Sequence, residues 1–222
     1  MTDINIDLAR YNMIEQQIRP WDVLDPKVLE VIAETPRERF VPHEYANLAF
    51  TDTRIPLIHG QSMLEPKMEG RILQSLQIKP TDRILEIGTG AGFLTACLAK
   101  LGGNVVSVDI FPEFSQQSQQ LVIGLGIDNA QFQVGDASHG WDQDGEFDII
   151  AITGSLFQIP ETFKRSLTIG GRLFAVSGDD VPMAMDAQLI KRLGKDEFST
   201  ESLFETYLSA LINAEKPQTF VF

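Results

Sequence analysis

The sequence has few of the residues that form disulfides or metal sites. Cys97 is the only cysteine among 222 residues, so no internal disulfide and no cysteine-based metal cage can form. The three histidines, His43, His59 and His139, show no metal-ligand spacing such as H-E-x-x-H. We therefore expect no bound metal, and we expect Cys97 to pack in the core rather than act as a nucleophile.

Basic residues and long hydrophobic runs are also scarce. The chain has 18 Lys and Arg against 31 Asp and Glu, a formal net charge of −13, with no Lys/Arg cluster. Because neutralisation of phosphates by Lys and Arg dominates nucleic-acid affinity, we expect no nucleic-acid partner. No apolar run approaches the roughly 20 residues of a membrane span, and residues 1–20 lack the basic and apolar regions of a signal peptide. We expect a cytoplasmic protein that does not bind membranes.

Two parts of different character follow one another along the chain. Residues 1–80 predict helices and loops; for example, Asp25 is placed to cap a helix that starts at Pro26 and stops before Pro36. From residue 81 onward, short apolar strands alternate with helices, which is typical of a parallel sheet covered on both faces. We therefore predict an α/β fold with a mostly parallel, twisted sheet and an N-terminal helical extension, folded as one compact unit.

The α/β part can be divided into individual elements. The expected strands cover residues 83–88, 104–110, 130–136, 147–154 and 170–178, and the expected helices cover residues 92–102, 112–126 and 160–167. Residues 187–212 resemble two further strands in a hairpin-like return. Such an ending would make the sheet a mixed one.

A glycine-rich turn, ILEIGTGAGFLTACLA, joins the first expected strand to its helix. Gly88, Gly90 and Gly92 permit a tight turn and let a ligand approach the backbone. A dinucleotide fingerprint would need Gly or Ala where Phe93 stands. Glu86 adds an acid to the strand, which suits the sulfonium and ammonium groups of S-adenosylmethionine and would penalise a diphosphate. The motif therefore favours S-adenosylmethionine over a dinucleotide.

Two acids stand at the ends of the following strands. Asp109 ends the second strand, where a carboxylate can accept hydrogen bonds from both ribose hydroxyls. Asp136 ends the third strand, at the same sheet edge, and could accept from an adenine amino group. The alternative is that the glycines and acids are only turns and caps of some other α/β protein.

Several segments, taken together and in order, resemble one known family. They are RERFVP (37–42), GQSMLEPKM (60–68), LEIGTGAGF (85–93), VGDAS (134–138), FDIIAITG (147–154) and GGRL (170–173). Over roughly residues 8–180 the chain resembles protein-L-isoaspartate O-methyltransferases. The glycine motif is shared by many methyltransferases, whereas the RERFVP and GQ segments are more specific to this family.

The resemblance implies a Rossmann-like methyltransferase core over residues 81–222, preceded by a helical cap and acceptor-side loop over residues 1–80. It implies repair of damaged proteins in the cytoplasm by methylation of the free α-carboxyl of isoaspartyl residues. S-adenosylmethionine would be the cofactor and S-adenosylhomocysteine the product. The cofactor-binding residues that it implies are Glu86, Gly88, Thr89, Gly90, Gly92, Asp109, Ile110, Asp136, Ala137 and Thr153.

The acceptor-side loop departs from the family pattern G-Q-T-I-S-x-P. Ser62 matches the Thr and keeps a hydroxyl, but Leu64 stands at the position of the Ser. A carboxylate acceptor is already a nucleophile and needs positioning rather than a general base. A hydroxyl that orients a charged acceptor contributes about 1.5–3 kcal/mol. Ser62 and the substituted Leu64 are therefore the candidates on the catalytic side.

Three functions remain open from the sequence. The first is methylation of isoaspartyl residues in a damaged protein or peptide. The second is a methyltransferase with a changed, small-molecule acceptor, and the third is a cofactor-binding regulatory protein without catalysis. The sequence leaves open a monomer or a homodimer.

Overall fold

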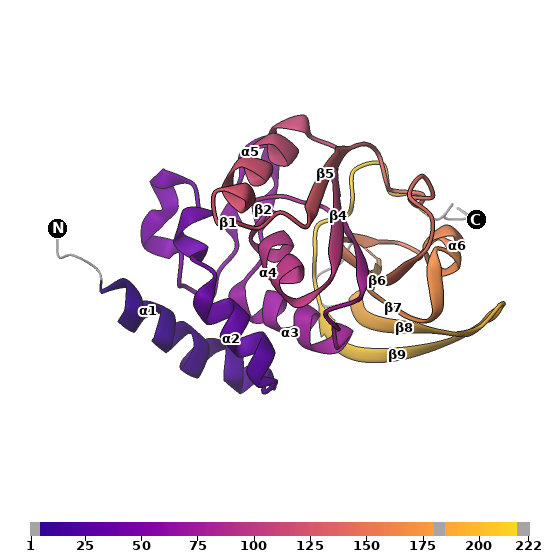
Figure 1. Cartoon of the computed structure of the whole chain (residues 1–222), viewed down its shortest axis with the longest axis horizontal. Coiled ribbons are helices and arrows are strands. Elements are labelled where there is room, and N and C mark those ends of the chain that lie inside the picture. Colours follow the sequence, from indigo (N-terminus) through magenta and orange to yellow (C-terminus); the bar gives the residue numbers. More distant parts are fainter. Residues whose placement is uncertain (1–4, 180–184, 217–222) are drawn as a thin grey trace, which may run out of the picture.

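A seven-stranded mixed sheet forms the centre of the molecule (Figure 1). The computed structural model describes residues 5–179 and 185–216. The strands of the sheet are β3 Arg83–Ile87, β4 Asn104–Asp109, β5 Ala130–Val134, β6 Phe147–Leu156, β7 Leu167–Gly178, β8 Met185–Gly194 and β9 Glu197–Thr206. Their order is β5-β4-β3-β6-β7-β8-β9, with parallel pairs up to β7 and antiparallel pairs of β8 with β7 and β9. The predicted parallel sheet with a hairpin-like return is confirmed.

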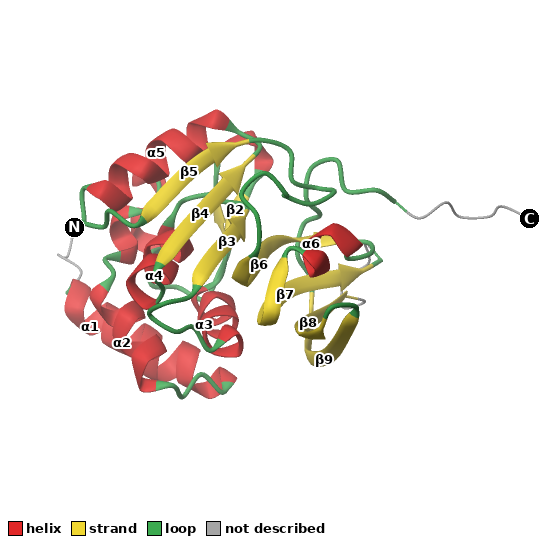
Figure 2. Ribbon diagram, turned by 45° about the vertical axis from the view of Figure 1, so that its right-hand side comes forward, coloured by secondary structure: helices red, strands yellow, loops and turns green. Residues whose placement is uncertain are grey.

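Helices cover both faces of this sheet, as Figure 2 shows. They are α3 Pro66–Leu76, α4 Phe93–Leu101, α5 Pro112–Ile123 and α6 Glu161–Arg165. Alternate strand residues face opposite sides: Ile84 and Phe174 join the core under α3, α4 and α5, whereas Leu85 and Leu173 join the core with Phe163 of α6. The chain therefore has one buried apolar layer on each face of the sheet.

The N-terminal part packs as helices and short turns against the first of these layers. Its elements are α1 Ile6–Met13, a π-helical turn Ile14–Ile18, 3₁₀ turns at Arg19–Trp21, Arg37–Arg39, His43–Leu48 and Ile58–Gly60, α2 Pro26–Glu34, and the strand pair β1 Ile55–Pro56 and β2 Ser62–Met63. The Asp25 side chain accepts from the Lys27 N–H at 2.9 Å, so the predicted cap of α2 is present. Met13 and Ile32 share a buried cluster with sheet residues such as Ile84, so the first 80 residues contribute to the same core.

The carboxyl ends of the parallel strands meet at one edge of the sheet, which we call the carboxyl edge. In the register, Ile87 pairs with Val108, and Asp109 pairs with Val134. The Gly88 N–H donates to the Val108 carbonyl at 2.8 Å. The glycine turn and the acid after the next strand are therefore adjacent, as expected for neighbouring parallel strands.

Residues 207–214, which we call the return segment (yellow in Figure 1), run from β9 back across this edge. The Ser155 N–H of β6 donates to the Ser209 carbonyl at 2.9 Å, and the Leu211 N–H donates to the Ser155 carbonyl at 2.9 Å. The Ser155 hydroxyl donates to the Leu208 carbonyl at 2.8 Å. These bonds tie the return segment to the end of a central strand, 53 or more residues away in sequence.

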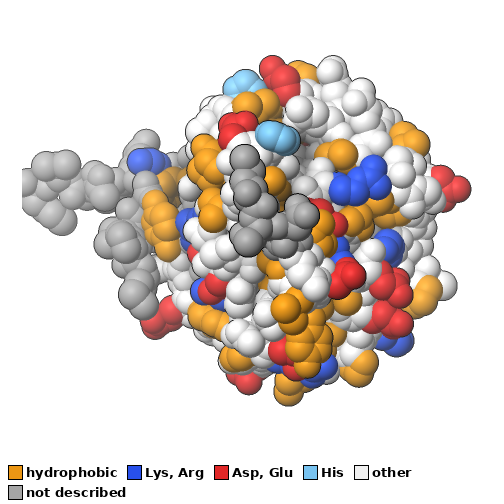
Figure 3. Space-filling view, turned by 90° about the vertical axis from the view of Figure 1, so that its left-hand side faces the viewer, with side chains coloured by type: hydrophobic (Ala, Val, Ile, Leu, Met, Phe, Trp, Pro, Cys, Tyr) orange, Lys and Arg blue, Asp and Glu red, His pale blue; other side chains and the backbone are white. Residues whose placement is uncertain are grey.

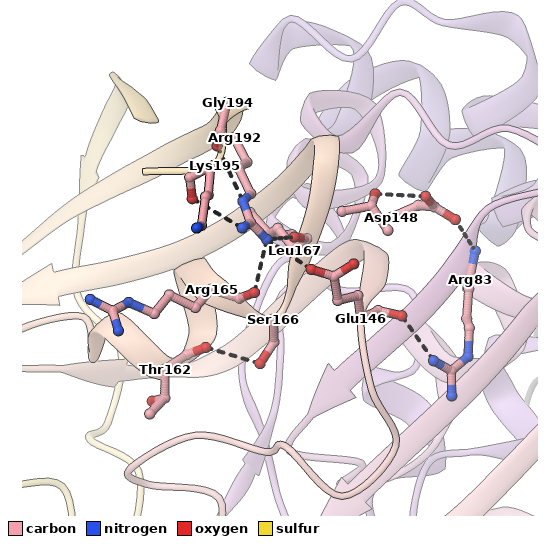
Figure 4. Close-up of polar contacts among 11 residues, drawn as sticks. Arg83, Glu146, Asp148, Thr162, Arg165, Ser166, Leu167, Arg192, Gly194 and Lys195 are labelled. Carbon is pink, nitrogen blue, oxygen red and sulfur yellow. Dashed lines mark hydrogen bonds and ion pairs between the residues drawn. The ribbon is translucent and has the colours of Figure 1, made fainter. Parts of the chain in front are cut away.

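The opposite, amino edge of the sheet is held by Arg192 on β8 (Figure 4). This residue is 9% exposed. Its guanidinium donates to five acceptors, which are the Glu146 carboxylate and the carbonyls of Arg165, Leu167, Gly194 and Lys195. One side chain therefore satisfies the backbone where β7 begins and where β8 turns into β9.

The surface on the side of the N-terminal helices is mixed in character. Figure 3 shows basic, acidic and hydrophobic side chains interspersed over this face. Three hydrophobic side chains of α1 are exposed, namely Ile6, Leu8 and Tyr11. Within residues 5–179 and 185–216, no helix is long and apolar enough to cross a membrane.

Candidate active site

A pocket that opens to solvent lies at the carboxyl edge; its empty space, counted together with the adjoining solvent, is about 1060 Å³. Three stretches line it: the glycine turn with the neighbouring strand ends, residues 54–64, and residues 208–212 of the return segment. It is lined by every residue predicted for the site, namely Ser62, Leu64, Glu86, Gly88, Thr89, Gly90, Gly92, Asp109, Ile110, Asp136, Ala137 and Thr153. Pockets at the carboxyl ends of parallel strands are the usual ligand sites of open α/β sheets.

The glycine turn has a backbone conformation that would be strained for any residue with a side chain. Gly88, Gly90 and Gly92 have φ values of 94°, 50° and 85°. A Cβ atom on Gly88 would lie 2.2 Å from Thr153 Oγ1, and one on Gly92 would lie 2.6 Å from Ser118 Cβ. Conformation therefore favours glycine at all three positions, and space also requires it at Gly88 and Gly92; together the three leave a cradle beside the backbone.

Thr153, in the second half of β6, holds this turn in place. Its hydroxyl lies 2.9 Å from the carbonyls of both Ile87 and Gly88. One hydroxyl hydrogen shared between two carbonyls fixes the start of the turn. The side chain therefore supports the cradle rather than presenting a free donor to the pocket.

Glu86 is a fully buried acid beside the glycine turn. Its Oε2 accepts from the hydroxyls of Thr95 at 2.5 Å and Ser107 at 2.6 Å, while its Oε1 has no hydrogen-bond partner. Burial raises the pKa of Glu86 to about 8; the two hydroxyls oppose the shift, and the nearby acids Asp109 and Glu69 add to it. An unpartnered buried oxygen that lines a pocket is suited to accept from a cationic ligand.

Asp109, at the end of β4, accepts two backbone hydrogen bonds. Its Oδ2 accepts from the Gly90 N–H at 2.9 Å and its Oδ1 from the Phe111 N–H at 3.0 Å. Burial raises the pKa of Asp109, and these backbone bonds oppose the shift. Since each carboxylate oxygen can accept more than one hydrogen bond, both oxygens retain capacity for a ligand.

Asp136 lies in a more solvated part of the pocket than Asp109. Its Oδ1 accepts from the Ser138 N–H and its Oδ2 accepts from the Asn213 side-chain amide, both at 2.9 Å. The Ser138 backbone bond is the main reason that the pKa of Asp136 is lowered. Sequence reasoning missed Asn213, because it lies 77 residues away and no local motif marks it.

A buried ion pair between Arg37 and Glu69 holds the acceptor-side loop at Leu64. Arg37 is 1% exposed and its partner Glu69, on α3, is 2% exposed. The Arg37 Nη2 donates to the Leu64 carbonyl at 2.6 Å, and its Nε donates to the Ala49 carbonyl at 3.0 Å. Burial raises the pKa of Glu69 to about 7, although Arg37 opposes the shift. The pair therefore fixes the backbone of the loop at Leu64.

Ser62 and Leu64 take different places in this loop. Ser62 is exposed at the pocket wall, whereas Leu64 is half-buried and packs against the core. His59, in a left-handed conformation, stacks on Phe111 with ring centroids 4.2 Å apart. The loop thus presents one hydroxyl and an apolar wall to the pocket.

Cys97 is inaccessible within α4. Its side chain is fully buried in the first core layer. Burial raises the pKa of its thiol to about 12. The thiol therefore packs in the core and is no nucleophile at neutral pH.

The sheet order, the glycine turn after β3, the acid at the end of β4 and the pocket above them define a Rossmann-like methyltransferase fold. A solved Plasmodium falciparum structure shares the architecture with a TM-score of 0.75 at 20% identity. The match covers 93% of this chain and 98% of that chain, which is described as a protein-L-isoaspartate O-methyltransferase in complex with S-adenosyl-L-homocysteine.

Residues 9–215 match the family model described as Protein-L-isoaspartate(D-aspartate) O-methyltransferase, and the chain belongs to this family. It is 33% identical to Protein-L-isoaspartate O-methyltransferase 1 of Rhodopseudomonas palustris, over 93% of this chain and 84% of that protein. It is 34% identical to the Protochlamydia amoebophila protein-L-isoaspartate O-methyltransferase, over 93% of this chain and 98% of that one. The match thus extends past residue 180, the approximate limit of the resemblance seen in the sequence, and includes β8 and β9.

Proposed function

We propose that the protein transfers a methyl group from S-adenosylmethionine to the free α-carboxylate of isoaspartyl residues in damaged proteins. The observation that carries the proposal is the buried, unpartnered Glu86 oxygen beside the glycine cradle, in a chain of this family. A cation suits this place, because a positive ligand offsets the mutual repulsion of the buried acids. Protein repair and a cytoplasmic location stay predictions, and cell fractionation would test the second.

The described residues fit this cofactor. Gly88, Gly90 and Gly92 would let its methionine part approach the backbone, and Glu86 Oε1 would accept from its cationic part. Of the remaining predicted residues, we assign Asp109 and Ile110 to the ribose and Asp136 and Ala137 to the adenine. We assign Thr89 and Thr153 to support of the glycine turn. Asn213 already donates to Asp136, so we assign it to the adenine side as well.

When bound, S-adenosylmethionine supplies a methyl group on a sulfonium that leaves as a neutral thioether. A carboxylate oxygen of the acceptor would form the new O–CH₃ bond as the S–CH₃ bond breaks, and no proton would move. The protein would therefore act by holding the acceptor carboxylate close to the methyl group. We assign this placement to residues 1–80 as an acceptor-side cap, with the loop of Ser62 and Leu64 fixed by Arg37.

Two measurements test the proposal together. Titration calorimetry should show binding of S-adenosylmethionine, and Asp109→Ala should weaken this binding at least tenfold if it holds the ribose. A methyl-transfer assay with an isoaspartyl peptide should show turnover by the wild-type protein. No cofactor binding would overturn the assignment of the pocket, and binding without transfer would overturn the assignment of the acceptor.

A further inference from the structure

Arg54 is a cation in an otherwise acidic pocket. Of the described residues that line the pocket, it is the only Lys or Arg, whereas four are acids, namely Glu69, Glu86, Asp109 and Asp136. Its side chain is 28% exposed. It lies two residues after Asp52 and one before β1, on the acceptor-side stretch rather than on the cofactor-side strand ends.

The guanidinium of Arg54 is only partly occupied by protein acceptors. Its Nη2 donates to the Tyr207 carbonyl in the return segment, and the group lies 5.7 Å from the Tyr207 ring centroid. Its Nε forms an ion pair with the Glu65 carboxylate at 3.7 Å, a distance longer than a hydrogen bond. Among the described residues, its Nη1 donates to no acceptor. Arg54 thus joins the two stretches that cover the glycine turn and keeps donors available.

An anionic acceptor needs a cation in this pocket. The acids of the pocket suit the cofactor, but in their ionised form Glu86, Asp109 and Asp136 repel an acceptor carboxylate brought close to the methyl group. Ser62 offers one neutral hydroxyl, and Leu64 offers none. A planar guanidinium matches a carboxylate in both charge and geometry.

We propose that Arg54 binds the acceptor carboxylate and thereby selects an anionic acceptor, an inference that rests on the proposed function. One carboxylate oxygen accepts from the guanidinium, and the other forms the O–CH₃ bond. The product ester is neutral, so its attraction to Arg54 is weaker than that of the substrate. Arg54 therefore favours binding of the substrate carboxylate over retention of the ester.

A purely structural role would also explain the contact with Tyr207, and a matched control separates the two roles. Arg71 on α3 donates to the Trp21 carbonyl at 3.0 Å and lies 4.6 Å from the Phe204 ring centroid. It thus makes the same kinds of contact as Arg54, but it does not line the pocket. Arg71→Gln therefore removes a comparable structural contact away from the acceptor.

The experiment measures peptide affinity for the full-length protein loaded with S-adenosylhomocysteine. The probes are one isoaspartyl peptide with a free α-carboxylate and the same peptide with an α-carboxamide. The wild-type protein should prefer the carboxylate peptide about tenfold or more, since a charged hydrogen bond is replaced by a neutral one. Arg54→Gln should bring the preference close to one, Arg54→Lys should keep part of it, and Arg71→Gln should keep all of it.

Two results would overturn the role of Arg54. One is a wild-type protein that does not prefer the carboxylate peptide, including one that binds neither peptide. The other is an Arg54→Gln variant that binds both peptides more weakly by the same factor. That result would indicate that Arg54 only holds the Tyr207 backbone. Retained S-adenosylhomocysteine binding shows that each variant is folded. A carboxylate preference that depends on Arg54 in a protein that transfers no methyl would support Arg54 while contradicting the proposed function.

Discussion

The two edges of the central sheet use their polar groups in opposite ways. At the amino edge, Arg192 donates to five acceptors, and the backbone around it is satisfied by the protein itself (Figure 4). At the carboxyl edge, one buried oxygen of Glu86 has no hydrogen-bond partner. Gly88 there has a conformation that would be strained for any other residue. The first arrangement stabilises the fold, and the second leaves interactions for a ligand to complete.

The largest expected effect comes from one methyl group at the carboxyl edge. Gly88→Ala places a Cβ 2.2 Å from Thr153 Oγ1, so we expect calorimetry to show S-adenosylmethionine affinity reduced by more than about a hundredfold. Gly170→Ala is the matched control: Gly170 has a similar φ of 88°, but its Cβ would meet nothing within 4 Å. Equal loss of affinity in both variants would contradict a specific cradle at Gly88.

At the amino edge, Arg192→Met should act on stability alone. Four carbonyls lose their donor, so we expect the free energy of unfolding to fall by about 3 kcal/mol in urea titrations, with unchanged cofactor affinity in the folded fraction. Arg83→Met removes one exposed hydrogen bond to the Glu146 carbonyl and the contact of the guanidinium with the Phe147 ring, and it should cost about 1 kcal/mol. A loss of cofactor affinity in Arg192→Met would show that the two edges are coupled.

Glu86→Gln should weaken cofactor binding about tenfold and remove its pH dependence. With a pKa of about 8, Glu86 is largely neutral at pH 7 in the free protein. Because a bound cation favours the carboxylate, wild-type affinity should rise as the pH rises towards 8, and binding below pH 8 should release a proton. Calorimetry in buffers of different ionisation enthalpy measures this release. Glu205→Gln, on the exposed side of β9, should leave the cofactor affinity and its pH dependence unchanged.

The same residue has a second, opposite effect on the free protein. The pKa of Glu86 is higher in the folded protein than its ordinary value of 4.5, so the folded state binds the proton more tightly than the unfolded state. The free energy of unfolding should therefore fall as the pH rises from about 4.5 to 8, and Glu86→Gln should be more stable than the wild type at pH 8. Thermal unfolding without cofactor measures this difference, and a less stable variant would contradict it.

Leu64→Ser should have the smallest effect on catalysis. It adds a hydroxyl to the pocket wall. Because we already assign Arg54 and Ser62 to the acceptor, kcat/KM for an isoaspartyl peptide should change less than about tenfold. Loss of apolar packing should lower stability by about 1–2 kcal/mol. A rise in kcat/KM of a hundredfold or more would show that the wild-type loop is poorly matched to isoaspartate.

The sequence predicts the local parts of this molecule well and the distant contacts poorly. The alternation of strands and helices and the glycine turn can be predicted from short-range patterns in the sequence. The carboxyl ends of neighbouring parallel strands lie at the same edge of a sheet, so their proximity can also be predicted. Arg54 and Tyr207 are 153 residues apart, and Arg37 and Glu69 are 32 apart. Such pairs have no spacing rule, so only the folded chain shows them. Within the helical part predicted for residues 1–80, α1 changes to a π-helical turn after Met13, which no pattern in the sequence marks.

Methyl transfer to paired peptides would show directly whether the protein recognises isoaspartate. The full-length protein would be given methyl-labelled S-adenosylmethionine and either an isoaspartyl peptide or the identical peptide with ordinary aspartate. We expect the label to enter only the isoaspartyl peptide, as a methyl ester that base releases, and Gly88→Ala to abolish the labelling. Equal labelling of both peptides, or no labelling of either one by a protein that binds the cofactor, would contradict this expectation.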